Sequence, residues 1–319
     1  HDGLVGEFSV VPPKKLGERD KKKDGTYDTR KLPAGKQLCK FTDPTSGKKN
    51  VFPKRAENWR GMWWDGALLH MSWSLWYDVG GVQNYKHHMA AKRKPDGTWE
   101  TVIEPYSMKI RPHRCAGYIT TAPKWWAEKH LGGRRFLTGF NVAQGTGASN
   151  CGPGLYAYDP KKPGDAITLM EFPHSKGTHD EMWRPCDAWR GVVFIDTGAK
   201  YAVMFCGRKS LGEVYYGVGR PGDASGSKGY HCDPYRPEVR LYDPDTLLKV
   251  LKTELKPHQP RPAETGDLTK LWFQPDRAFL TAGIGYDPVN RLVYIAQLRG
   301  ERDSSRYEAV PAIHVWRIK

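Results

Sequence analysis

The chain has 319 residues, a net charge of +15 and many aromatic side chains, including 12 Trp and 16 Tyr. No segment approaches the roughly 18 consecutive apolar residues that a membrane-spanning helix needs, so we expect a soluble protein. The 34 Gly and 24 Pro are typical of many short strands joined by turns, and one all-β domain can reach this length.

Strand patterns dominate the chain after a charged, proline-containing N-terminal segment. Residues 1–57 are expected to form an irregular arm that wraps the domain or supplies a closing strand, and residues 58–319 the β domain. Short apolar or alternating runs predict strands. These runs occupy residues 59–78, 116–121, 136–143, 154–158, 192–195, 201–206, 213–218, 238–242, 279–286, 291–297 and 312–318. Only two short helices are expected, over residues 123–130 and 246–253.

A repeated strand-to-turn motif indicates the architecture. Tyr158, Tyr242 and Tyr286 each precede an Asp-Pro turn, and the first two are separated by 84 residues, close to twice 42. A period of about 42 residues corresponds to one four-stranded propeller blade. The sequence therefore predicts an all-β, five-bladed β-propeller, with a β-sandwich as the alternative. The predicted blades cover residues 58–105, 106–175, 176–222, 223–262 and 270–319.

The six cysteines indicate the redox environment in which the protein is expected to fold. Their even number and wide spacing favour disulfides in an oxidising environment, with buried free thiols as the alternative. The chain begins at His1, which is consistent with removal of a leader peptide, so a secreted or periplasmic protein is expected. The cysteines are Cys39, Cys115, Cys151, Cys186, Cys206 and Cys232.

Candidate site residues occur in polar clusters that separate blades would bring to one mouth of a central channel. The predicted catalytic residues are His113, Tyr118, His231, Tyr235, Asp187 and Asp233. The predicted substrate-binding residues are Arg114, Arg184, Arg208, Arg236, Trp64, Asp65 and Trp183. Each has an ordinary structural alternative, since histidines are often hydrogen-bonded within strands and tryptophans commonly fill cores.

The positive charge predicts a polyanionic partner, and acidic polysaccharide fits the aromatic and His/Tyr/Arg content best. The preferred chemistry is β-elimination, in which Arg neutralises a uronate carboxylate and His or Tyr transfers protons. Hydrolysis by Asp65, Asp187 and Asp233 is a second possibility, and non-catalytic carbohydrate binding is a third. A nucleic-acid partner is disfavoured because the sequence contains no recognition motif for RNA or DNA. The protein is expected to be a monomer.

The residues suggest two metal sites, one for calcium and one for copper. A propeller channel can hold a structural Ca²⁺ through carboxylates and carbonyls, although no EF-hand loop occurs. If His1 is the mature N-terminus, its amine and imidazole can bind copper together with His87 or His88. No cofactor is required by the sequence.

Three stretches carry a resemblance at the level of architecture. Residues 152–160, 203–208 and 229–231 resemble secreted bacterial β-propeller proteins, and residues 58–319 resemble propeller carbohydrate-active enzymes in their residue inventory. That group includes five-bladed glycosidases and ulvan-type lyases. The resemblance implies a carbohydrate ligand and assigns no individual activity.

Overall fold

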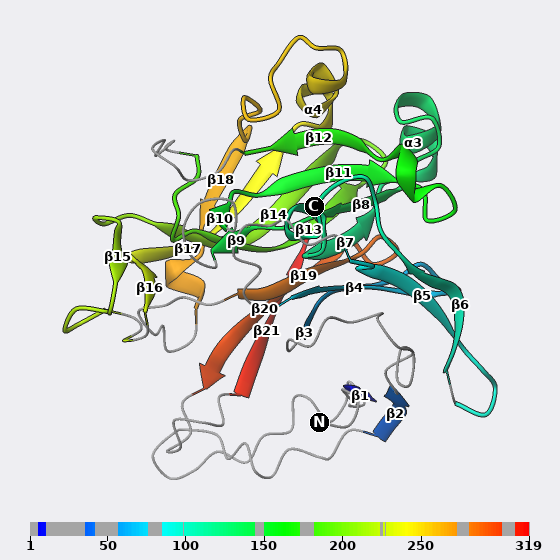
Figure 1. Ribbon diagram of the computed structural model, residues 1–319, viewed down its shortest axis with the longest axis horizontal. Coiled ribbons are helices and arrows are strands. Elements are labelled where there is room, and N and C mark those ends of the chain that lie inside the picture. Colours follow the sequence, from blue (N-terminus) through cyan, green and yellow to red (C-terminus); the bar gives the residue numbers. More distant parts are fainter. Residues whose placement is uncertain are drawn as a thin grey trace.

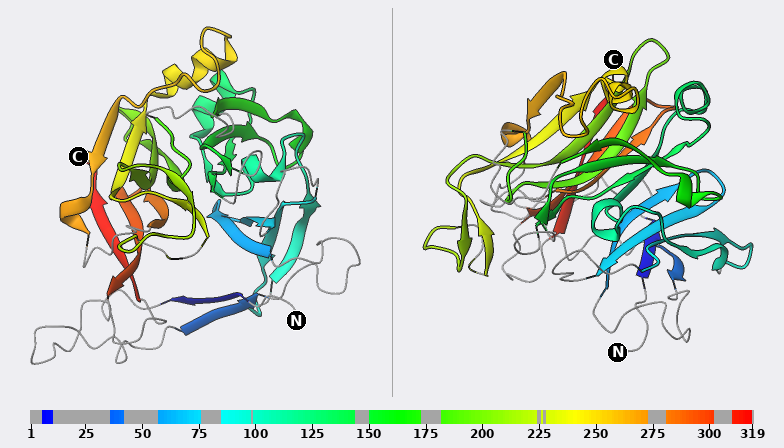
Figure 2. Two further views of the ribbon diagram at one scale, coloured as in Figure 1. Left: turned by 60° about the vertical axis from the view of Figure 1, so that its left-hand side comes forward. Right: turned by 45° about the horizontal axis from the view of Figure 1, so that its top comes forward.

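The chain forms an all-β structure with a β-propeller-like arrangement of sheets around a common centre (Figures 1 and 2). The computed structural model describes residues 6–10, 36–41, 57–75, 85–97, 99–143, 150–172, 182–223, 226, 228–272, 281–301 and 310–318. Four antiparallel sheets of three or four strands make up the body, and we call them blades 1 to 4. No helix among the described residues is long and apolar enough to cross a membrane.

Blades 1 and 2 follow one another along the chain. Blade 1 has the strand order β3 (Glu57–Trp64), β4 (Leu69–Leu75), β5 (His88–Arg93) and β6 (Trp99–Tyr106). Blade 2 has the order β7 (Tyr118–Thr121), β8 (Phe136–Gly139), β11 (Gly154–Tyr158) and β12 (Ile167–Glu171). In both, the first strand in sequence lies at one edge of the sheet.

Blades 3 and 4 continue this pattern. Blade 3 has the order β13 (Ala188–Asp196), β14 (Tyr201–Ser210), β17 (Tyr235–Tyr242) and β18 (Glu264–Asp267). Blade 4 has the order β19 (Thr281–Asp287), β20 (Leu292–Glu301) and β21 (Val310–Arg317). The first strands of the four blades contact one another in chain order, β3 with β7, β7 with β13 and β13 with β19. These four strands therefore form the inner wall of the arrangement.

The described residues form four blades, so the predicted number of five is wrong. The segments 176–222 and 223–262, expected to be separate blades, form one sheet because β14 pairs with β17 over Val203↔Tyr242 to Ser210↔Tyr235. The hairpin of β15 (Tyr215–Gly217) and β16 (Gly229–His231) is inserted between these paired strands. Tyr158 and Tyr242 both end the third strand of a blade, so their separation of 84 residues spans one blade repeat plus this insertion.

Smaller elements connect the blades. The remaining sheets are β1 (Gly6–Val10) with β2 (Lys36–Phe41), and β9 (Val142–Ala143) with β10 (Asn150–Cys151). The helices among the described residues are α2 (Pro112–Cys115), α3 (Lys124–His130) and α4 (Pro244–Leu251), with single turns η3 (Pro163–Asp165) and η4 (Thr269–Leu271). In the described part of the chain, β21 pairs with β20 and β1 pairs with β2. Most of the N-terminal arm, which was expected to wrap the domain or to supply a closing strand, lies outside the described residues.

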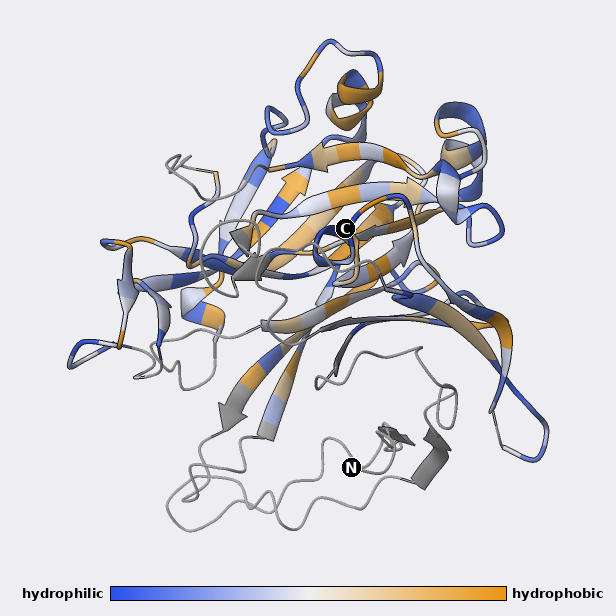
Figure 3. Cartoon of the chain, in the orientation of Figure 1, coloured by the Kyte–Doolittle hydropathy of each residue, from blue (hydrophilic) through white to orange (hydrophobic). Residues whose placement is uncertain are grey.

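Apolar side chains hold the blades together. Trp126, Trp189 and Phe205 are among the fully buried residues of the largest cluster, which joins α3 to blades 2 and 3. A second cluster joins blades 3 and 4, and includes Val193 and Ile295. Figure 3 shows apolar colour along β11 and β12 and hydrophilic colour at the tip of the β5–β6 hairpin. Burial of these side chains supplies the main driving force for folding.

Glycine permits close approach of the inner strands. A Cβ on Gly61 of β3 would lie 2.7 Å from Ser72 Oγ and 3.0 Å from the carbonyl oxygen of Gly117. A Cβ on Gly191 of β13 would lie 2.8 Å from the amide nitrogen of Ile284 in β19. Since real Cβ atoms do not approach this closely, any larger residue at these positions would push neighbouring blades apart.

Candidate anion-binding pocket

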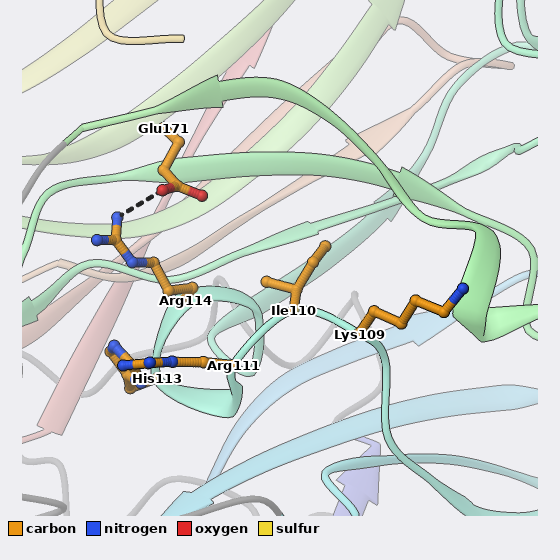
Figure 4. A pocket seen from close by; sticks show the side chains of 6 residues that line it. All are labelled: Lys109, Ile110, Arg111, His113, Arg114 and Glu171. Carbon is orange, nitrogen blue, oxygen red and sulfur yellow. Dashed lines mark ion pairs between the residues drawn. The ribbon is translucent and has the colours of Figure 1, made fainter. Parts of the chain in front are cut away.

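A cavity of about 410 Å³ lies where the connection between blades 1 and 2 passes the edge of blade 2. Its lining residues are Lys109, Ile110, Arg111, His113, Arg114 and Glu171. Five of the six come from the short segment between β6 and β7, and Glu171 ends β12. Figure 4 shows Arg114 directed toward Glu171, while Lys109 extends to the other end of the pocket with Ile110 between them.

Local sequence explains how this segment presents its side chains. Pro112 occupies the first position of α2, where its fixed φ favours a helical turn and no amide donor is missed. The turn closes through a hydrogen bond of 2.9 Å from the amide of Ala116 to the carbonyl of Pro112. Cys115, fully buried in a cluster with Tyr156 and Tyr158, anchors the inner side of the turn. The outer side therefore carries the polar lining of the pocket.

Arg114 is fixed in place by two partners. Its Nη1 donates to the carbonyl of Phe172 at 2.7 Å and lies 3.2 Å from Oε1 of Glu171. The second carboxylate oxygen of Glu171 accepts a hydrogen bond of 2.5 Å from the hydroxyl of Tyr156. Burial and the nearby Glu171 carboxylate raise the pKa of Tyr156 well above its ordinary value, which keeps this hydroxyl a donor.

The pocket has an excess of positive charge. The lining contains three cationic side chains, Lys109, Arg111 and Arg114, and the single carboxylate of Glu171, which is already engaged by Arg114 and Tyr156. Lys109 and Arg111 are exposed, whereas His113 is buried beneath them at 3% exposure. Such a cavity can accept an anionic group at its open side, with guanidinium and ammonium donors around it.

The predicted residue Asp187 lies elsewhere, in blade 3, and is fully buried. Its Oδ2 accepts hydrogen bonds from Lys209 Nζ at 2.8 Å and from the amide of Arg184 at 3.1 Å. Its Oδ1 accepts from the amide of Ser210 at 2.8 Å and from the hydroxyl of Ser210 at 2.6 Å. With four donors and no exposed surface, this carboxylate connects the start of β13 to the end of β14.

Blade 3 also gathers the predicted residues Arg184, Arg208, Tyr235 and Arg236. Arg184 donates to the carbonyls of Ser210 and Gly212 at 3.2 and 2.8 Å. Arg208 lies over the ring of Tyr235, with 4.2 Å between its Cζ and the ring centroid. Arg236 pairs with the buried Glu238. In these contacts the cationic side chains bind carbonyl oxygens, an aromatic ring and a carboxylate of the same part of the chain.

His231 and Asp233 belong to the hairpin inserted in blade 3. The ring of His231 stacks on Tyr215 with centroids 5.2 Å apart, and its Nε2 lies 3.1 Å from the carbonyl oxygen of Gly217. Asp233 is exposed and precedes a cis peptide bond to Pro234. His113 and His231 are thus carried by different elements, α2 and β16.

The other predicted residues are distributed over three blades. Trp64 is 50% exposed and packs edge-on against Trp99, with ring centroids 6.4 Å apart. Asp65, in the β3–β4 turn, pairs with His70 at 2.9 Å. Tyr118 and Trp183 are buried, and the Tyr118 hydroxyl donates to the carbonyl of Gly154 at 2.5 Å. Of the predicted residues, the pocket therefore contains His113 and Arg114.

In the described part of the chain, the cysteine side chains are thiols and the side chains that could bind a metal are dispersed. Cys115, Cys151, Cys186, Cys206 and Cys232 are buried free cysteines, so the predicted disulfides are not present among them. Within the same residues, no group of three or more His, Cys, Asp or Glu side chains is placed to hold a metal ion. His1 and the side chain of Cys39 lie outside the described residues.

Sequence reasoning missed four of the six lining residues, namely Lys109, Ile110, Arg111 and Glu171. Lys109 and Arg111 lie within five residues of Arg114, so their proximity to the predicted cluster was the available signal. Glu171 is distant in sequence and reaches the pocket through the pairing of β12 with β11, where Gly154 is opposite Glu171.

No protein-family model matches this sequence, and no curated protein matches it with significant similarity. The function is therefore inferred from the geometry and charge of the described residues.

Proposed function

We propose that this chain binds an acidic saccharide, with the carboxylate or sulfate group of the sugar held in the pocket formed by Lys109, Arg111, His113, Arg114 and Glu171. The observation that carries this proposal is the excess of positive charge around a 410 Å³ cavity in which the one carboxylate is already paired. The net charge of +15 supports it, since a positive field raises the local concentration of polyanions.

The pocket has a cationic side chain at each end, which suits a ligand with more than one acidic group. Arg114 and Lys109 lie at opposite ends with the apolar Ile110 between them (Figure 4). Arg114 is held rigidly by Phe172 and Glu171, so it loses little freedom when it contacts a ligand. Lys109 and Arg111 are exposed and can adapt to the position of the acidic group.

The reaction that we propose for this site is β-elimination at a uronate. Arg111, which lies beside His113 (Figure 4), neutralises the sugar carboxylate and thereby acidifies the C5–H bond next to it. His113 is buried at the wall of the pocket, so its ring must turn toward the cavity to take the C5 proton. The electron pair of the C5–H bond then forms the C4=C5 double bond, and the C4–O bond breaks. The leaving oxygen takes a proton from water at the open side of the pocket.

Hydrolysis by Asp65, Asp187 and Asp233 is less well supported. A general acid or nucleophile must reach the substrate, whereas the carboxylate of Asp187 has no exposed surface and accepts four hydrogen bonds. Asp65 is engaged by His70 and by the amides of Ala67 and Leu68. Binding without cleavage needs the same pocket and is distinguished by the absence of product.

The test is incubation with uronate-containing, sulfated and neutral polysaccharides, read by two assays in parallel. Elimination produces an unsaturated uronate that absorbs in the ultraviolet and also releases reducing ends; hydrolysis releases reducing ends alone. We expect ultraviolet-absorbing product from a uronate polymer, and its loss in His113→Gln while binding is retained. Retained activity in His113→Gln would contradict the mechanism, and absence of binding to every acidic polymer would contradict the proposed function.

A further inference from the structure

A second cavity, of about 330 Å³, lies among the inner strands and shares no lining residue with the pocket described above. Every blade contributes to its wall. The lining residues are Arg60, Gly117, Tyr118, Phe140, Trp189, Arg190, Thr281, Ala282 and Leu298. Because β3, β7, β13 and β19 contact one another in this order, the cavity lies in the central region that the four blades enclose.

Irregularities in strand pairing coincide with this cavity. The register of β3 shifts between Trp59 and Met62, that of β13 between Trp189 and Gly191, and that of β19 between Thr281 and Gly283. The residues at these shifts include Arg60, Arg190 and Ala282, which all line the cavity. A β-bulge redirects a side chain from its alternating position, and bulges are frequent beside functional sites.

Two of the lining residues are cationic, and none of the lining residues is acidic. Arg60 donates from Nε to the hydroxyl of Ser74 at 3.1 Å and lies over the ring of Phe140, with its Cζ 5.3 Å from the ring centroid. Arg190 is half-buried, and no carboxylate among the described residues forms an ion pair with it.

The electrostatic environment of these two guanidiniums is unfavourable without an added negative charge. Burial lowers the pKa of Arg190 to about 10, and repulsion from Arg60 and Arg208 contributes to the shift. Burial also lowers the pKa of Arg60. Removing a cation from water without a counter-charge is costly, so an anion that enters this cavity gains interactions that water alone does not supply.

We infer that the central cavity binds a small oxyanion between Arg60 and Arg190. A carboxylate, sulfate or phosphate group offers several acceptor oxygens, which match the fork of donors on each guanidinium. Tyr118, Phe140 and Trp189 form the aromatic part of the wall and limit the water around the ion. The ion can be a free inorganic oxyanion or the acidic group of a saccharide, and the two sources share this chemistry.

The experiment is isothermal titration calorimetry of the full chain with sodium sulfate, at constant ionic strength set with chloride. We expect saturable binding by the wild-type chain, retained in the exposed control Arg317→Gln, while Arg111→Gln reports any separate binding of sulfate in the first pocket. The Arg190→Gln variant should bind at least about tenfold more weakly, because it removes one of the two guanidiniums. Circular dichroism verifies that each variant is folded. If Arg190→Gln does not fold, the sulfate affinities of Arg190→Lys and Arg60→Gln are measured in its place.

The variants distinguish binding of sulfate in the central cavity from binding in the first pocket, on which the proposed function rests. Loss of sulfate binding in Arg190→Gln with retention in Arg111→Gln supports the central site. Loss in Arg111→Gln with retention in Arg190→Gln overturns it and leaves the first pocket intact, and absence of binding to the wild-type chain also overturns it. Competition by glucuronate for the site lost in Arg190→Gln identifies an acidic sugar group as the occupant; without competition the occupant is an inorganic ion.

Discussion

Asp187 illustrates how a residue with catalytic chemistry can serve the fold instead. Its side chain is fully buried and that of Lys209 is only 8% exposed, and their charged atoms lie 2.8 Å apart. Burial lowers the pKa of Lys209, while the Asp187 carboxylate acts in the opposite direction and favours the charged ammonium. The pair therefore depends on both partners, because either one alone would be an uncompensated buried charge.

We expect Asp187→Asn to lower the free energy of unfolding by about 3 to 5 kcal/mol, since the ammonium of Lys209 would lose its counter-charge. Urea denaturation followed by tryptophan fluorescence measures this change. In the double variant that also carries Lys209→Met, part of the loss should be recovered. A fully stable Asp187→Asn protein that had lost activity would instead indicate a catalytic carboxylate.

His87 and His88 form a second buried polar unit, between blades 1 and 2. The amide of Met108 donates to Nε2 of His87 at 3.3 Å, so the proton of this ring lies on Nδ1 and is donated to Nδ1 of His88 at 2.6 Å. Nε2 of His88 then donates to the hydroxyl of Thr138 at 3.1 Å. This chain of hydrogen bonds requires both imidazoles to be neutral.

Stability should consequently decline in mildly acidic solution. Burial lowers the pKa of His87 to about 3, and burial together with His87 lowers the pKa of His88. Between about pH 6.5 and pH 3 the unfolded chain binds protons that the folded chain does not, so lowering the pH favours unfolding. For His87 the loss is on the order of 2 kcal/mol at about pH 5 relative to neutral pH, and His88 contributes in the same direction.

Denaturation curves at neutral pH and at about pH 5 measure this dependence. His87→Gln should weaken it, and the surface control His258→Gln should leave it unchanged. Equal stability of the wild-type chain at the two pH values would rule out neutral buried imidazoles at these positions.

At the scale of elements, the strands were the most predictable feature. The runs at 154–158, 201–206 and 291–297 correspond to β11, β14 and β20, because buried strands carry dense β-branched and aromatic side chains. Strands β5 and β6 were missed, since His88–Arg93 and Trp99–Tyr106 contain many charged residues. Both expected helices are present, as α3 and α4.

The contact between β8 and β11 gives a prediction about element packing. A Cβ on Gly139 would lie 1.9 Å from the carbonyl oxygen of Gly154, and backbone atoms cannot yield as a flexible side chain can. Gly139→Ala should destabilise the protein by about 3 kcal/mol or more. The matched strand variant Gly285→Ala, where a Cβ meets nothing within 4 Å, should change stability by less than about 1 kcal/mol. The melting temperatures of the two variants measure the difference, and equal values would contradict this packing.

At the scale of the whole molecule, the all-β propeller-like arrangement followed from strand spacing, and the number of blades did not. The insertion of β15 and β16 lengthened one repeat, so Tyr158 and Tyr242 were counted as two blades apart. The pocket was partly predictable, because His113 and Arg114 lie in one short cluster. Arg60 and Arg190 could not be identified, since a bulge in a strand leaves no mark in the hydrophobic pattern.

The most direct test of the central claim is the affinity of an acidic oligosaccharide and its neutral counterpart for the wild-type chain and Arg111→Gln, measured by calorimetry at fixed ionic strength. We predict selective binding of the acidic sugar, weakened by about tenfold in Arg111→Gln and reduced by added salt, because exposed charges are screened. The exposed control Arg317→Gln should bind as the wild-type chain does. Equal affinity for the acidic and neutral sugars, or unchanged affinity in Arg111→Gln, would contradict the account.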